Sequence, residues 1–158
     1  MTGAADDRAA VTERLGREPR GDWEVAARDV EGRPTVIRNA PFLEDGTPMP
    51  TLYWLIDPDL VRRIGTLESL GGVRRAEAEL DAGSIADAHR RYAAERDAAI
   101  PPGHVGPRPS GGVGGTARGV KCLHTHYAWF LVGGEDPVGS WVHDALQRQF
   151  AATSVVER

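Results

Sequence analysis

The chain has 158 residues, 19 basic and 23 acidic side chains, and a net charge of −4. This length predicts one domain spanning residues 1–158, which can bury a core without disulfides or metals, and the acidic balance argues against general nucleic-acid binding. A single cysteine, an acidic start that is no signal peptide and the lack of an apolar run of roughly 20 residues predict a cytoplasmic protein with no membrane insertion.

The N-terminal half is predicted to hold a short helix or frayed end, followed by three strands. Residues 1–15 either form a helix that docks through Val11 and Leu15 or fray. Three β-type runs follow, and Glu31-Gly32 between the first two is typical of a tight hairpin turn. Short connections favour an antiparallel sheet. The predicted strands are residues 23–29, 34–39 and 51–56.

From residue 57 the apolar residues recur at helical spacing. Asp57 is a good N-cap with Pro58 at N1, and Ser84 with Asp87 forms a capping box for a charged helix that we expect at the surface. The predicted helices lie within 57–72, 73–83, 84–99, 120–134 and 136–152. The fold class is therefore α+β, with a small N-terminal antiparallel sheet of about three strands packed against a C-terminal set of four to five helices.

Residues 100–118 form a long Pro/Gly-rich loop between the third and fourth of these helices. A connection of this length without secondary structure is uncommon in a compact domain, and is usually functional or disordered.

The segment after this loop, GVKCLHTHYAWFLVGG, gathers the candidate site residues Cys122, His124 and His126. If it is extended, all three side chains point the same way and can reach one metal ion. If it is helical, only Cys122 and His126 share a face. Leu123 and the apolar residues after it favour a helix that begins at Lys121 or Cys122.

Three uses of these residues remain open at this point. Cys122 can be a buried small hydrophobe, with the histidines bonded to backbone or water. It can be a metal ligand, although the chain has no second close pair of Cys or His such as structural zinc sites use. It can also be a nucleophile, since a helix N-terminus and nearby His126 or Lys121 would lower the pKa of the thiol.

Several motifs are distinctive beyond their composition: a G-x-P strand entry, a D-G-T-P-x-P-T-x-Y-W-L block, an L-E-x-x-G helix end, and a K-C-L-H-x-H segment with its P-V-G close. With them the chain resembles, over about residues 15 to 145, the bacterial family called domain of unknown function 501. The family has no established activity. Its members are small, soluble and cytoplasmic, many are actinobacterial, and their genes often lie near those for enolase, a septum-formation initiator and an exopolyphosphatase-like enzyme.

The resemblance also implies a ligand set. Relatives carry cysteine where this chain has Asp29 and Asp57, which together with the K-C-L-H cysteine gives three thiols near histidines. In this chain the site either persists with harder ligands or is lost, and Asp57 then only caps its helix. The harder set would suit zinc, and it comprises Asp29, Asp57, Cys122 and His126 or His124.

Three functions follow as expectations. The leading one is a zinc-binding protein with a binding or regulatory role. The second is a thiol-dependent or hydrolytic enzyme with Cys122 as nucleophile and His126 or His124 as base. The third is a metal-free interaction module, linked to cell division or envelope growth, that binds a protein partner through the 84–99 helix and the loop before Cys122.

Overall fold

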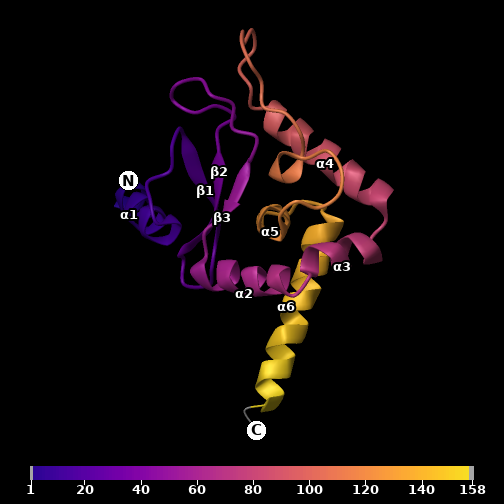
Figure 1. The fold of residues 1–158 in the computed structure, drawn as a ribbon. Coiled ribbons are helices and arrows are strands. Elements are labelled where there is room, and N and C mark those ends of the chain that lie inside the picture. The colour runs from indigo at the N-terminus through magenta and orange to yellow at the C-terminus, as the bar shows by residue number, and fades with distance from the viewer. Residues whose placement is uncertain (1, 157–158) are drawn as a thin grey trace.

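The computed structural model describes residues 2–156 of the chain, and the side chains of residues 6–149 (Figure 1). A three-stranded sheet near the N-terminus is followed by helices, which confirms the predicted α+β class. The elements are α1 (Thr2–Leu15), β1 (Trp23–Arg28), β2 (Pro34–Asn39), β3 (Tyr53–Leu55), α2 (Pro58–Ser69), α3 (Gly72–Glu79), α4 (Ala82–Asp97), a 3₁₀ turn η1 (Val113–Gly115), α5 (Leu123–Leu131) and α6 (Pro137–Val156).

The sheet has the order β1-β2-β3, and both strand pairs are antiparallel. The hairpin between β1 and β2 closes with a hydrogen bond from the Asp29 N–H to the Arg33 carbonyl. Gly32 takes φ +82° in this turn, a backbone conformation that glycine adopts without strain. Central strand β2 is almost entirely buried because elements cover both of its faces.

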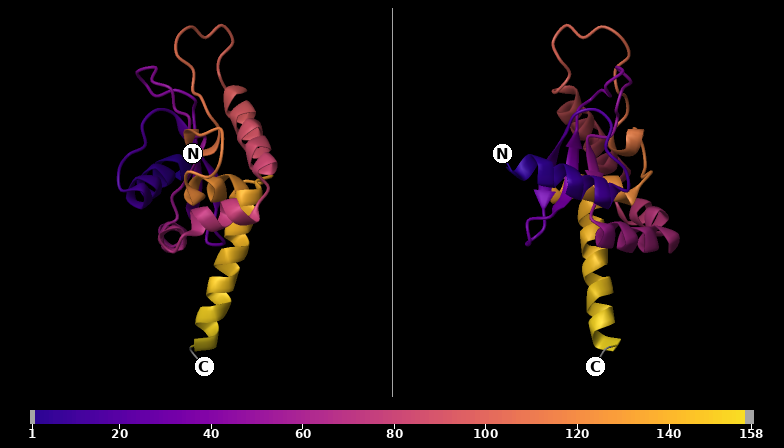
Figure 2. Two further views of the ribbon diagram at one scale, coloured as in Figure 1. Left: turned by 45° about the vertical axis from the view of Figure 1, so that its right-hand side comes forward. Right: turned by 90° about the vertical axis from the view of Figure 1, so that its left-hand side faces the viewer.

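The two faces of the sheet pack against different layers. On one side α1 buries Val11 against Ile37 and Ile56, so residues 2–15 form a docked helix where the sequence also allowed fraying. On the other side Val36 and Leu55 join the larger core that the helices build. In Figures 1 and 2, α1 and α5 lie on opposite sides of the sheet, and α6 runs away from the body of the fold.

Helix α4 begins earlier and lies deeper than predicted. Asp81, not Ser84, is its N-cap, because an Asp81 carboxylate oxygen accepts the Ser84 N–H. The helix lies at the surface with one face exposed, as expected, but its other face buries residues at helical spacing, including Ile85 and Tyr92. The buried face of α4 therefore contributes to the main hydrophobic core.

The long loop after α4 is held at its base by a buried arginine. Arg96 is 1% exposed, and its guanidinium donates to the carbonyls of Pro50, Pro109 and Gly111 at 3.1, 3.4 and 2.9 Å. Buried backbone carbonyls that lie outside helices and strands need hydrogen-bond donors from elsewhere in the protein. Arg96 supplies these donors, so the loop is fixed to α4 where it returns toward α5.

None of the described helices is both long and apolar enough to cross a lipid bilayer.

Candidate metal centre

Cys122 stands immediately before helix α5. Its backbone is extended, with φ −149° and ψ 121°, and the helix begins at Leu123. In this position the side chain does not follow the helical spacing that would pair it with His126. Instead its sulfur lies 3.6 Å from Nδ1 of His124. The expected pairing of Cys122 with His126 on one helix face was therefore wrong, because Cys122 is the N-cap and not part of the helix.

Glu68, in the last turn of α2, completes this cluster. Its Oε1 lies 3.0 Å from Nδ1 of His124, and its Oε2 accepts the N–H of Leu123 at 3.1 Å. Within the part of the chain that the structure describes, Glu68, Cys122 and His124 are the one group of possible metal ligands whose donor atoms all lie within 4.8 Å of one another. Glu68 is not among the residues predicted for the site, and its only signal in the sequence is its place in the L-E-x-x-G helix end.

The orientation of His124 is determined by the backbone of α2. Its Nε2 lies 2.9 Å from the carbonyl oxygen of Val61, which can only accept a hydrogen bond, so Nε2 carries a proton. The nitrogen that faces Cys122 and Glu68 is therefore Nδ1. Histidines that bind metals usually donate their other ring N–H to a carbonyl or carboxylate in this way, which holds the ring and its tautomer.

The same contacts couple the charges of the thiol and the imidazole. The hydrogen bond with Cys122 raises the pKa of His124 to about 9, and Glu68 adds to this, against the opposing effect of burial. Burial alone would raise the pKa of Cys122, but hydrogen bonds from His124 and Thr125 outweigh it and hold that pKa below its usual range. Without a metal, the imidazole beside Cys122 therefore favours the thiolate form more than water does for a free cysteine.

His126 points the other way, into the core. The imidazole is 0% exposed, and its Nδ1 lies 2.6 Å from Oδ2 of Asp136, whose side chain is equally buried. The other carboxylate oxygen of Asp136 accepts the Val138 N–H at the start of α6. His126 therefore joins α5 to α6, and its predicted place beside Cys122 as ligand or base was wrong.

Asp29 and Asp57 also lie outside the cluster. Asp29 accepts the N–H groups of Glu31 and Arg33 in the hairpin turn, at 2.9 and 3.0 Å, and pairs with the Arg33 side chain. Asp57 caps α2 by accepting two backbone N–H groups. The two aspartates line one surface pocket, but Asp57 and Glu68 stand at opposite ends of α2. The predicted ligand set thus divides, and only Cys122 and His124 remain together.

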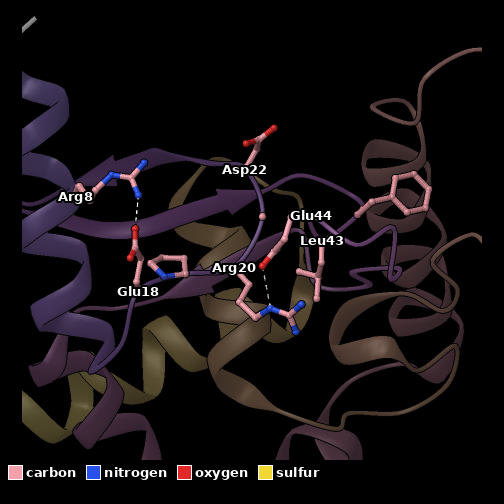
Figure 3. A pocket seen from close by; sticks show the side chains of 9 residues that line it. Arg8, Glu18, Arg20, Asp22, Leu43 and Glu44 are labelled. Carbon is pink, nitrogen blue, oxygen red and sulfur yellow. Dashed lines mark hydrogen bonds and ion pairs between the residues drawn. The ribbon is translucent and has the colours of Figure 1, made fainter.

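A larger pocket of about 550 Å³ lies between α1 and the loop after β2 (Figure 3). Its arginines already have partners, since Arg8 pairs with Glu18, and Arg20 pairs with Glu44. Its lining residues come from α1, the segment before β1 and the loop after β2, and none of them belongs to the Cys122 cluster. The pocket therefore adds no group to the candidate metal centre.

The family model described as "Protein of unknown function (DUF501)" matches residues 25–144. The matched region runs from β1 into α6 and includes all three residues of the cluster. No curated protein and no solved structure matches the chain.

Proposed function

The chain belongs to the DUF501 family of proteins of unknown function, and we propose that it is a zinc-binding protein whose site is formed by Glu68, Cys122 and His124. The proposed role is binding or regulation in the cytoplasm. The proposal rests on one observation: a carboxylate oxygen from α2, an imidazole nitrogen from α5 and the thiol of the residue before α5 converge within 4.8 Å.

The contacts around the ligands support this assignment. His124 is oriented by the Val61 carbonyl, and Glu68 by the Leu123 N–H, so two of the three ligands are already held by backbone groups. Such outer contacts reduce the ordering that metal binding requires, and they are typical of metal sites. Nδ1 of His124 lies 3.6 Å from Sγ of Cys122 and 3.0 Å from Oε1 of Glu68, and this convergence favours a metal site over a simple helix cap.

The donor set suits zinc among the common metal ions. Sulfur, imidazole and carboxylate are all zinc ligands, whereas calcium and magnesium prefer oxygen alone. Three protein ligands leave a fourth position for water or another ligand, as in zinc sites that are not purely structural. The cysteine and the histidine are partly exposed, so an incoming ligand can reach this position.

Zinc binding is tested by titrating the metal-free chain in competition with a chromophoric chelator. We expect one equivalent of zinc to bind, and we expect Cys122→Ser to lower the affinity by at least about 100-fold, because even outer-shell changes cost 10- to 100-fold. Asp57→Asn is the matched control, since asparagine caps a helix equally well and lies outside the site. Equal zinc affinities for the wild type and Cys122→Ser would refute the proposed site.

The Cys122–His124 contact favours a second candidate function, thiol chemistry at the same site. In the metal-free chain we expect iodoacetamide to alkylate Cys122 faster than a model thiol at pH 7, because the lowered pKa of the thiol keeps more of it as thiolate. The rate should persist as pH falls below about 8.5, the ordinary cysteine pKa, and decline only at the lower pKa of Cys122.

His124→Gln should move this pH profile back toward that of a model thiol, because it removes the imidazolium. Zinc should protect Cys122 from alkylation in the wild type. A wild-type rate equal to that of a model peptide at every pH would exclude the thiolate–imidazolium pair.

A further inference from the structure

We infer that His89 on α4 is a positioning residue for the proposed zinc site: its two ring nitrogens hold both ends of the 113–119 segment, which leads to Cys122. The inference rests on the proposed function, since it concerns how one ligand of that site is presented. His89 is not a ligand itself, and it acts through the backbone of residues 113–119.

The hydrogen bonds of His89 determine the orientation, the tautomer and the charge of its ring. The N–H of Val113 donates to Nδ1 at 3.0 Å, and Nε2 lies 2.7 Å from the carbonyl oxygen of Gly119. An N–H can only donate and a carbonyl can only accept, so the ring is neutral with its proton on Nε2. One buried side chain thus joins the two ends of the 113–119 segment.

The backbone at Gly112 also packs tightly against His89. A Cβ atom on Gly112 would lie 2.5 Å from Cβ of His89, so the loop backbone runs directly against the helix. Val113, which carries the anchored N–H, and Val120, which follows the anchored Gly119 carbonyl, are both buried in the main core. The loop is therefore clamped between α4 and the core, rather than lying freely on the surface.

Only one of the three proposed ligands depends on this clamp. Cys122 follows Gly119 by three residues and precedes α5, whereas Glu68 and His124 are carried by helices. If the clamp is lost, the added freedom of the loop passes to Cys122 first. We therefore expect loss of His89 to weaken ligation by sulfur more than ligation by imidazole or carboxylate.

The groups around His89 favour the neutral ring. Burial lowers the pKa of His89, and the nearby His126 ring, 5.6 Å away between centroids, acts in the same direction. Asp136, on the far side of His126, and the Gly119 carbonyl oppose these effects. The clamp does not require a charge on His89.

Cobalt(II) can test the inference because it reports the identity of its ligands. Its d–d bands measure bound metal, and its thiolate-to-cobalt charge-transfer band measures coordination by Cys122. We expect His89→Phe, which removes both hydrogen bonds, to lower the charge-transfer intensity per bound cobalt and to weaken cobalt affinity at least about tenfold. His89→Gln, which can keep a donor for the Gly119 carbonyl, should recover part of the signal.

Tyr92→Phe is the matched control. Tyr92 lies one turn further along α4, and its hydroxyl accepts the N–H groups of Leu52 and Tyr53 rather than contacting the loop. This variant should lose stability and keep the wild-type charge-transfer intensity. If His89→Phe does not fold, the comparison of His89→Gln with Tyr92→Phe decides the question.

The outcomes separate this inference from the proposed function. A wild-type chain that takes up no cobalt would overturn both. A wild type that binds cobalt through its thiolate, with unchanged spectra in the His89 variants, would overturn the inference alone. Equal losses in the His89 variants and Tyr92→Phe would also overturn it, because they would reduce His89 to a general contributor to stability.

Discussion

Replacing Arg96 with methionine is expected to destabilise the chain by about 3 kcal/mol or more, because each buried carbonyl left without a donor costs about 1–3 kcal/mol. Arg96 donates to the carbonyls of Pro50, Pro109 and Gly111, and methionine fills a similar volume without any donor. Unfolding in urea, followed by circular dichroism, measures the change as a lower midpoint with a similar slope.

Arg90→Met is the matched control for Arg96. Arg90 lies on the same helix, its side chain is 71% exposed, and its partner Asp87 is exposed as well. Exposed ion pairs contribute little, so this variant should stay within about 0.5 kcal/mol of the wild type. If the two variants lose similar amounts of unfolding free energy, the hydrogen bonds of Arg96 to the 109–111 carbonyls do not contribute the predicted stability.

Replacing His126 with alanine is expected to destabilise the chain by about 3–5 kcal/mol, the usual cost of removing one partner from a buried pair. Asp136 would keep a buried carboxylate that has lost its imidazole partner, and a cavity would open between α5 and α6. Zinc affinity should stay close to that of the wild type under conditions where the variant is folded.

His124→Ala provides the reciprocal comparison, two residues earlier on the same helix. Its side chain is partly exposed, so we expect a small change in the stability of the metal-free chain and a large loss of zinc affinity. If His126→Ala instead loses zinc and keeps its stability, the assignment of the two histidines is reversed. Chemical unfolding and zinc titration of both variants measure these effects.

The local structure of this chain follows closely from its sequence where short-range chemistry decides it. Asp57 and Pro58 begin α2 as predicted, since the cap and the proline both act within one turn. Gly32 closes the predicted hairpin for the same reason. The β-type runs formed the expected strands, because alternation and β-branched residues are local properties.

The candidate site was only half predictable because its contacts join distant parts of the chain. Cys122 and His124 stand out by residue type, but Glu68 reaches them only through the packing of α2 on α5. No spacing rule relates a carboxylate in one helix to a thiol before another. Likewise, His126 resembled a ligand in the sequence, and only its burial against Asp136 shows it to be a core residue.

Helix α5 thus separates two roles within one turn. His124 faces α2 and the partly exposed thiol, whereas His126 faces α4 and α6 inside the core. A change at either histidine alters a different property of the protein, which makes the two positions independent tests. The long loop before α5 matters for the same reason, since it sets where Cys122 enters the site.

A structure of the zinc-loaded chain tests the central claim most directly. We predict one zinc ion about 2.3 Å from Sγ of Cys122, and about 2.0–2.2 Å from Nδ1 of His124 and a carboxylate oxygen of Glu68. Nε2 of His124 should remain bonded to the Val61 carbonyl. Zinc bound instead at Asp29 and Asp57, or a Cys122 thiol that contacts only protein atoms in the presence of excess zinc, would contradict the account.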